Sequence, residues 1–172
     1  MADSRPTATV LARAGARDVV LVDDEGRGHG EELGAEFPDV DVVRTDAPVF
    51  WTGAIRLGAE RALARGSTGV LFFNQDVTVS PGYFERLART AARHPGEVVG
   101  SVVSYAQQPG RIWSAGARME WFGRGFRILF HNAPESALPV DPLSVDWLHG
   151  MGTYVPATVF AQIGLPDAER FP

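Results

Sequence analysis

The sequence predicts a single α/β domain. Short apolar runs rich in Val, Leu and Phe alternate with segments whose apolar residues recur at helical spacing. This alternation is typical of βαβ units, in which helices cover a largely parallel sheet. The length of 172 residues suits one domain, and 45% hydrophobic with 22% charged residues is enough for an ordinary globular core. Because no linker, repeat or low-complexity stretch divides the chain, we expect residues 1–172 to form one domain.

Composition excludes several classes of function. The formal net charge is −5, so no general basic field favours nucleic acid, and we expect no nucleic-acid partner. The absence of cysteine rules out thiolate metal ligands and cysteine nucleophiles. No apolar run approaches the roughly 18 residues of a membrane-spanning helix, and the first residues lack an apolar signal core. We therefore expect a cytoplasmic protein without a transmembrane segment, while peripheral association with a membrane stays open.

The first part of the chain predicts two strands and a helix between them. Residues 19–22 form a compact apolar run, typical of a buried parallel strand, and Asp23 and Asp24 follow it directly. A short helix is predicted over 31–37, ended by the proline that follows it. Residues 40–44 predict the second strand.

A longer helix is predicted over residues 53–65, because its apolar residues recur at i, i+4, i+7 and i+8. Thr52 is the expected N-cap, and Gly66 stands where a helix commonly ends. The most hydrophobic run of the chain, residues 69–73, predicts the next strand and leads into Asn74, Gln75 and Asp76.

The middle of the chain changes character. Ser80 followed by Pro81 predicts a helix start, with a capping hydroxyl and then proline at the first position. An apolar strand is expected over 98–104. Glycines, aromatics and arginines mix over 111–130, which favours a hairpin or a bent antiparallel segment.

Shorter elements are predicted toward the end. Residues 132–142 form a proline-rich loop, and short strands are expected over 145–148 and 153–155 on either side of the sequence His-Gly-Met-Gly. A final helix is expected over 156–163, with Gly164 as its stop signal.

Polar side chains at two predicted strand ends are the main candidates for chemistry. In open α/β sheets, ligands bind outside the carboxyl ends of the strands, where Asp23, Asp24 and Asp76 are expected. A carboxylate there can accept hydrogen bonds from a nucleoside or hold a divalent cation, and Asn74 offers an amide oxygen two residues before Asp76. The alternative interpretation is that these residues form helix caps and a polar turn.

Other signals are weaker. The Gly-Arg-Gly-His-Gly run at 26–30 resembles a phosphate-binding loop, but its spacing is not that of a dinucleotide fingerprint, and a turn is the alternative. His149 offers a base or a phosphate contact, or a structural hydrogen bond. Trp113, Trp121 and Trp147 offer stacking surfaces for sugars, or core packing.

Taken together, the ordered motifs resemble family 2 glycosyltransferases of the rhamnosyltransferase-like branch. The matching segments are VVLVDD (19–24), FPDV (37–40), FWTGA (50–54), LFFNQDVT (71–78) with Ser80-Pro81, RIWSAG (111–116), DWLHGMGT (146–153) and IGLPDAERFP (163–172). The resemblance covers about residues 10–172 and implies a GT-A fold, a Rossmann-like mixed sheet flanked by helices.

The resemblance also implies roles for individual residues. A nucleotide-sugar donor would be bound by Asp23, Asp24, Gly53, Asn74, Gln75, Asp76, Gly150, Met151 and Gly152. Asp76, with Asn74 in place of the usual first carboxylate, would hold Mg²⁺ or Mn²⁺ on the diphosphate. The implied reaction is inverting transfer of the sugar to a hydroxyl of a saccharide or lipid-linked acceptor, in cell-surface polysaccharide synthesis.

Two departures from the family pattern matter. The opening strand and its turn are missing before residue 10, and the acidic block that supplies the catalytic base is expected beyond Pro172. Asp167 and Glu169 come before the position of that block, so the catalytic residue stays unknown. These departures predict an incomplete domain.

Three functions therefore stay open. The first is an active glycosyltransferase, and the second is a catalytically inactive fragment that binds a nucleotide-sugar. The third is an unrelated Rossmann-like nucleotide-binding protein, which predicts a fully parallel sheet after Val98.

Overall fold

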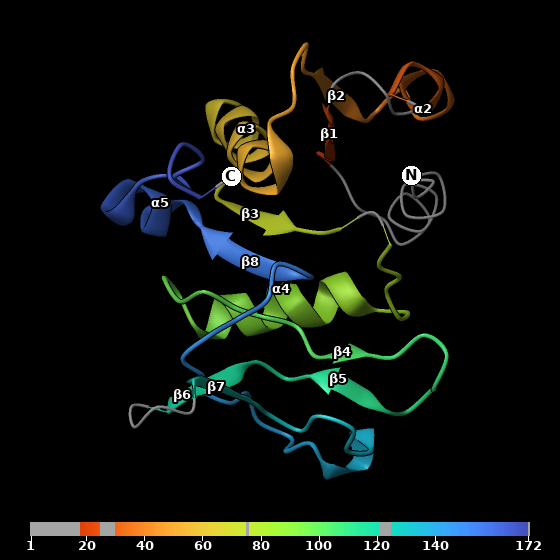
Figure 1. The fold of residues 1–172 in the computed structure, drawn as a ribbon, viewed down its shortest axis with the longest axis vertical. Coiled ribbons are helices and arrows are strands. Elements are labelled where there is room, and N and C mark those ends of the chain that lie inside the picture. The colour runs from red at the N-terminus through yellow and green to blue at the C-terminus, as the bar shows by residue number, and fades with distance from the viewer. Residues whose placement is uncertain (1–17, 25–29, 75, 121–124, 172) are drawn as a thin grey trace. The chain divides into compact units, whose positions relative to one another are not determined.

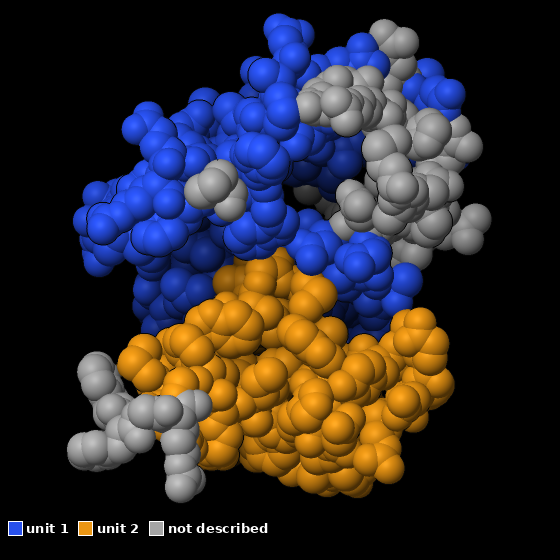
Figure 2. Space-filling view, in the orientation of Figure 1, with its two compact units in different colours: residues 1–98, 154–172 blue, residues 99–153 orange. Residues whose placement is uncertain are grey.

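The computed structural model describes residues 18–24, 30–74, 76–120 and 125–171. The chain divides into two compact units, which we describe separately (Figure 2). Unit 1 comprises Met1–Val98 and Tyr154–Pro172, and unit 2 comprises Val99–Thr153. Residues 26–29 of the predicted phosphate-binding loop, together with Gln75 and Trp121, lie outside the described residues.

Unit 1 begins with a parallel pair of strands. β1 (Val20–Asp23) pairs with β2 (Asp41–Arg44), with Val20 opposite Asp41 and Asp23 opposite Arg44. The helix α2 (Gly30–Glu36) connects them and contacts both strands, burying Leu33 (Figure 1). This is the predicted strand–helix–strand order, with bounds displaced by one residue.

The longest helix of unit 1 packs beside β1. α3 (Phe50–Ala64) contacts β1 and β3 (Gly69–Phe72), and Ala59 on this helix is fully buried. Gly66 lies just past its end at a φ of +84°, where glycine avoids a steric penalty, as predicted. β3 is paired with β8 (Thr153–Pro156), which leads directly into α5 (Ala157–Ile163) (Figure 1).

Aromatic side chains connect β3 to the helices that follow. Phe72 meets Phe160 of α5 edge to face, at 6.3 Å between ring centroids. Phe73 lies 5.8 Å from Tyr83 and 6.3 Å from Phe84, both on α4 (Tyr83–Arg93). Ring contacts thus join β3 to both α4 and α5.

Unit 2 is built from antiparallel pairs. β4 (Val103–Ser104) pairs with β5 (Ile112–Ser114), and β6 (Ala117–Glu120) pairs with β7 (Gly125–Ile128). The short 3₁₀ helix η2 (Glu135–Ala137) lies in the predicted proline-rich loop. The predicted hairpin is confirmed. The antiparallel pairs contradict the fully parallel sheet after Val98 that an unrelated Rossmann-like protein would have.

Four local predictions are wrong. Thr52 does not cap α3, which begins at Phe50 with Val49 as its N-cap residue. Ser80 and Pro81 do not open α4: Gly82 is the N-cap residue at a φ of +70°, and the Ser80 hydroxyl accepts a hydrogen bond from Arg86 instead. In both places the helix begins without a side-chain cap.

The other two errors concern strand length. The strand predicted over 98–104 is reduced to the two residues of β4, and the one predicted over 145–148 is reduced to a single bridge between Trp147 and Ala117. An apolar run does not form a strand where no neighbouring backbone is available along its whole length.

No helix within the described ranges is both long and apolar enough to cross a membrane.

Candidate functional site

Asp23, at the end of β1, is buried. Only 6% of its surface is exposed, and its carboxylate lies 3.7 Å from the guanidinium of Arg44, its register partner on β2. Gly30 closes over it, because a Cβ at Gly30 would lie 2.5 Å from Asp23 Oδ2. Asp23 therefore sits inside the contact between β1, β2 and the start of α2.

Asp24 faces a different environment. Its Oδ1 accepts hydrogen bonds from the backbone N–H of Val49 at 2.8 Å and from the hydroxyl of Thr45 at 3.2 Å. Its second oxygen, Oδ2, has no hydrogen-bond partner within the described part of the chain. Asp24 thus fixes the loop that leads into α3 through one of its two carboxylate oxygens.

The first turn of α3 has an unusual backbone. Phe50 adopts a φ of +56°, a conformation that bulky side chains rarely take and that costs on the order of 1–3 kcal/mol. The turn brings Val49 against Gly53, where an added Cβ would lie only 2.8 Å from Val49 Cβ. Gly53 is therefore needed to let the chain fold back at this point.

The end of β3 is joined to the same turn. The indole N–H of Trp51 donates a hydrogen bond to Asn74 Oδ1 at 3.3 Å. The backbone N–H of Val77 donates a hydrogen bond to the carbonyl of Asn74 at 3.4 Å, a bond of the kind that the alternative interpretation expected, and Asp76 is exposed. The start of α3 is thus bonded both to Asp24 after β1 and to Asn74 after β3.

The chemistry of these residues suits a hard cation that is only partly ligated by protein. Mg²⁺ commonly keeps several waters and binds one or two carboxylates together with the phosphates of its substrate. Asp76 supplies an exposed carboxylate, and Asn74 Oδ1 keeps a second lone pair besides the one that Trp51 uses. Since no group of three or more His or acidic residues gathers within the described ranges, the ligand would supply the remaining oxygens.

Unit 2 contains a contrasting cluster of rings around His149. The His149 side chain is 3% exposed and lies 5.6 Å from the ring of Trp113 and 6.2 Å from that of Trp147. Neither ring nitrogen has a hydrogen-bond partner in the described structure. Burial lowers the pKa of the imidazole, and nearby backbone groups of Met151 and Ser101 oppose that shift only in part.

The loop that follows His149 is held within unit 2. Gly152 is buried at a φ of +77°, and its carbonyl accepts a hydrogen bond from the Ser101 hydroxyl at 2.6 Å. Thr153 donates to the carbonyl of His149 at 2.5 Å. Gly150 and Met151 lie between these two anchors, half-buried. The geometry thus gives the predicted donor-binding loop a fixed backbone.

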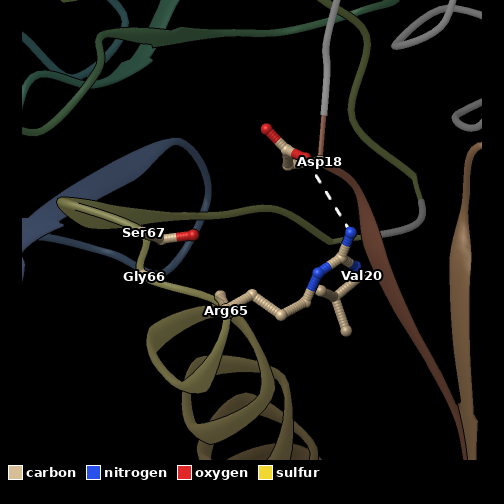
Figure 3. Close-up of a pocket in the computed structure, with 6 residues that line it drawn as sticks. Asp18, Val20, Arg65, Gly66 and Ser67 are labelled. Atoms are coloured by element: carbon tan, nitrogen blue, oxygen red, sulfur yellow. Dashed lines mark ion pairs between the residues drawn. The ribbon is translucent and has the colours of Figure 1, made fainter.

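A hollow of about 210 Å³ lies elsewhere in unit 1. Its lining residues are Asp18, Val20, Ala62, Arg65, Gly66 and Ser67, at the amino end of β1 and the carboxyl end of α3 (Figure 3). Arg65 spans it with ion pairs to Asp18 at 3.9 Å and to Asp41 at 3.0 Å. The site residues are predicted at the carboxyl ends of β1 and β3, so this hollow is a separate feature.

Sequence reasoning assigned no role to Trp51, Thr45 or Ser101, which hold the site residues in place. The one available signal was the Phe-Trp pair at a helix start, since two large aromatic residues are uncommon where a helix meets solvent. Trp113 and Trp147, considered as sugar platforms, both contact the ring of His149, although Trp147 remains 38% exposed.

Comparison with known proteins agrees with this architecture. The model of the glycosyltransferase like family 2 matches residues 9–172, nearly the whole chain. No curated protein matches the chain. The family carries the GT-A fold and glycosyl transfer, and the mixed α/β structure is consistent with both. The chain therefore belongs to the glycosyltransferase like family 2.

Proposed function

We propose that this glycosyltransferase transfers a sugar from a nucleotide-sugar to an acceptor hydroxyl with inversion, assisted by a divalent cation. The observation that carries the proposal is that one helix start is hydrogen-bonded to polar residues at two strand ends, Asp24 and Asn74. Ligands of open α/β sheets bind at such edges. Glycosyl transfer itself follows from the family; the donor, the cation and the stereochemistry are what we propose.

Each site residue has a proposed part. Asp24 Oδ2 would accept a hydrogen bond from the ribose or the base of the donor, with Asp23 buried beneath it. Gly53 would allow the backbone of α3 to approach the donor, and we keep Gln75 as a donor-binding residue on the resemblance to the family. The loop of Gly150, Met151 and Gly152 would face the donor sugar and the acceptor.

Asp76 and Asn74 would hold Mg²⁺ or Mn²⁺ against the diphosphate. Such a cation neutralises charge that develops on the leaving group. We assign no general base: the Asp167 carboxylate accepts a hydrogen bond from the backbone N–H of Arg170, which gives it a place in a turn. We place the reaction in the cytoplasm, with a saccharide or lipid-linked acceptor, in cell-surface polysaccharide synthesis.

Calorimetry with UDP, GDP and dTDP, with and without Mn²⁺, tests the proposal. We expect at least one nucleotide to bind in a Mn²⁺-dependent manner, and Asp76→Ala to weaken that binding by about 100-fold. Asp141→Ala is the control, because Asp141 is an exposed carboxylate in a loop of unit 2. Mn²⁺-dependent binding that survives in Asp76→Ala would contradict the metal assignment.

A nucleotide-release assay then separates the active enzyme from the inactive alternative. Turnover of the matching nucleotide-sugar favours the transferase. Binding without any release, under conditions that saturate the donor, favours a chain that binds the donor but does not turn it over.

A further inference from the structure

Two large aromatic side chains stand exposed at the first turn of α3. Phe50 is 60% exposed and Trp51 is 53% exposed, although other rings of unit 1, such as Phe72 and Phe73, pack against neighbouring rings. Exposed aromatic surface at the edge of a sheet is a common mark of a contact with a ligand or partner.

The position of the Trp51 ring is fixed by a hydrogen bond. Its indole N–H is bonded to Asn74 Oδ1 at 3.3 Å, so the ring is held beside the end of β3 rather than turning in solvent. A bond of Asp24 to the N–H of Val49 at 2.8 Å holds the preceding residue. Phe50, between them, keeps its left-handed backbone at a φ of +56°. Strained residues of this kind cluster at ligand-binding sites.

We propose that the face of Trp51 is the stacking surface for the base of the donor nucleoside. The inference rests on the proposed function, because it names how the same site recognises its nucleotide. A base has a flat π-face that stacks on indole, and its polar edge carries N–H groups. Asp24 Oδ2, which has no partner within the described ranges, is an acceptor for such a group, bonded to the same helix start.

Through its hydrogen bond, Trp51 would also position Asn74 for the cation, and this effect on cation binding must be separated from stacking. Removing the indole would release Asn74 Oδ1, a proposed ligand of the cation. Trp51→Ala removes both the ring face and the hydrogen bond, whereas Trp51→Phe keeps a ring face and removes only the hydrogen bond. Comparing the two variants therefore assigns any loss to one effect or the other.

The experiment measures affinity for UDP, GDP, dTDP and inorganic pyrophosphate in the presence of Mn²⁺. We expect Trp51→Ala to weaken the best nucleotide by about 5- to 100-fold, the range that stacking of one base supports, and to change pyrophosphate affinity much less. Trp51→Phe should keep most of the nucleotide affinity. Phe126→Ala is the control, since Phe126 on β7 of unit 2 is also 53% exposed.

Fluorescence supplies a measurement that does not depend on the folding of Trp51→Ala. Stacking of a base on indole should quench the wild-type emission, and this part of the quenching should be lost in Trp51→Phe. Three outcomes would overturn the stacking role while leaving the proposed function intact. Trp51→Ala could lose nucleotide and pyrophosphate affinity equally, or it could keep its full nucleotide affinity. Trp51→Phe could show the same quenching as the wild type. Failure of the wild type to bind any of the nucleotides would overturn the proposed function together with it.

Discussion

The two units place their polar groups in opposite environments. At the carboxyl ends of β1 and β3 in unit 1, Asp24 and Asp76 remain in reach of solvent, and Asp24 is bonded to the backbone of the next helix. In unit 2, His149 is enclosed by Trp113 and Trp147 and has no hydrogen-bond partner in the described structure. These two carboxylates of unit 1 therefore stay accessible to solvent, whereas the surroundings of His149 favour its neutral form.

The two regions differ in solvent access and in how strongly their backbone is constrained. The site of unit 1 depends on a constrained turn of backbone at Val49, Phe50 and Gly53. The cluster of unit 2 depends on side-chain rings that can adjust. Substitutions that fill space should therefore disturb the first region more than the second.

The largest effect is expected for Gly53→Ala. The new Cβ would lie 2.8 Å from Val49 Cβ, an atom next to the backbone that cannot rotate away. We expect a loss of about 1–3 kcal/mol in the free energy of unfolding, measured by urea denaturation. The clash should outweigh the gain of up to about 1 kcal/mol that alanine brings to a helix interior.

Gly58→Ala on the same helix is the matched control. Its Cβ would meet Val22 Cγ2 at 3.5 Å, an ordinary contact, so the propensity gain should leave stability unchanged or raised. If the two variants prove equally stable, the constrained turn is not a determinant of unit 1. In unit 2, Gly100→Ala should cost less than Gly53→Ala, because its Cβ would meet the flexible end of Leu148.

A smaller effect of opposite sign is expected for His149→Phe. A buried polar group without a hydrogen bond costs about 1–3 kcal/mol, and phenylalanine keeps a ring between the two tryptophans. We expect the variant to gain about 1 kcal/mol in unfolding free energy near pH 7. A loss of stability would mean that the imidazole makes a contact that the ring packing alone does not explain.

The unfolding free energy of His149→Phe should also depend on pH differently from that of the wild type. Burial lowers the pKa of His149 below its ordinary value of 6.5, so the unfolded chain binds the proton more readily than the folded one. Wild-type stability should therefore be complete above pH 6.5, fall as the pH drops below it, and level off below the folded-state pKa. His149→Phe should lack this decline, whereas His94→Gln, at the exposed end of α4, should retain it.

The order of the elements could be predicted from sequence, because it depends on local hydrophobic patterns. The runs before Asp23 and Asn74 form strands, and Gly66 and Gly164 end their helices as expected. The family motifs also indicated the correct family over nearly the whole chain.

The start of α3 could not be predicted, because distant contacts determine it. The pattern suggested Thr52 as a cap, but Asp24, which is 25 residues before Val49 in sequence, bonds the N–H of Val49 instead. The bond from Trp51 to Asn74 likewise joins residues 23 apart. Local propensity carries no information on such pairs, so these contacts were not predicted, whereas the strands that end near Asp23 and Asn74 were.

The smallest effect is expected at Asp41, where the charged groups of unit 1 meet at its surface. Asp41 accepts hydrogen bonds from Arg61 at 2.6 and 3.2 Å and from Arg65 at 3.0 Å, joining β2 to α3. The hydrogen bond from Arg61 is the main reason that the pKa of Asp41 lies below its ordinary value of 3.8, with Arg65 adding to the shift. Both arginines are about half exposed, so the contribution of these pairs is small and should weaken in high salt.

The sign of this contribution is opposite to that of His149. A carboxylate with a lowered pKa stabilises the fold fully above pH 3.8, and the stabilisation is lost as the pH falls through the folded-state pKa. Asp41→Asn should therefore remove part of the acid-induced decline in unfolding free energy below pH 3.8, with Asp39→Asn, an exposed carboxylate in the preceding turn, as the control. The His149 decline begins near pH 6.5 and that of Asp41 begins near 3.8, so the two variants alter different parts of the stability profile across pH. If the decline in unfolding free energy below pH 3.8 is the same in Asp41→Asn as in the wild type, the ion pairs of Asp41 do not stabilise the contact between β2 and α3.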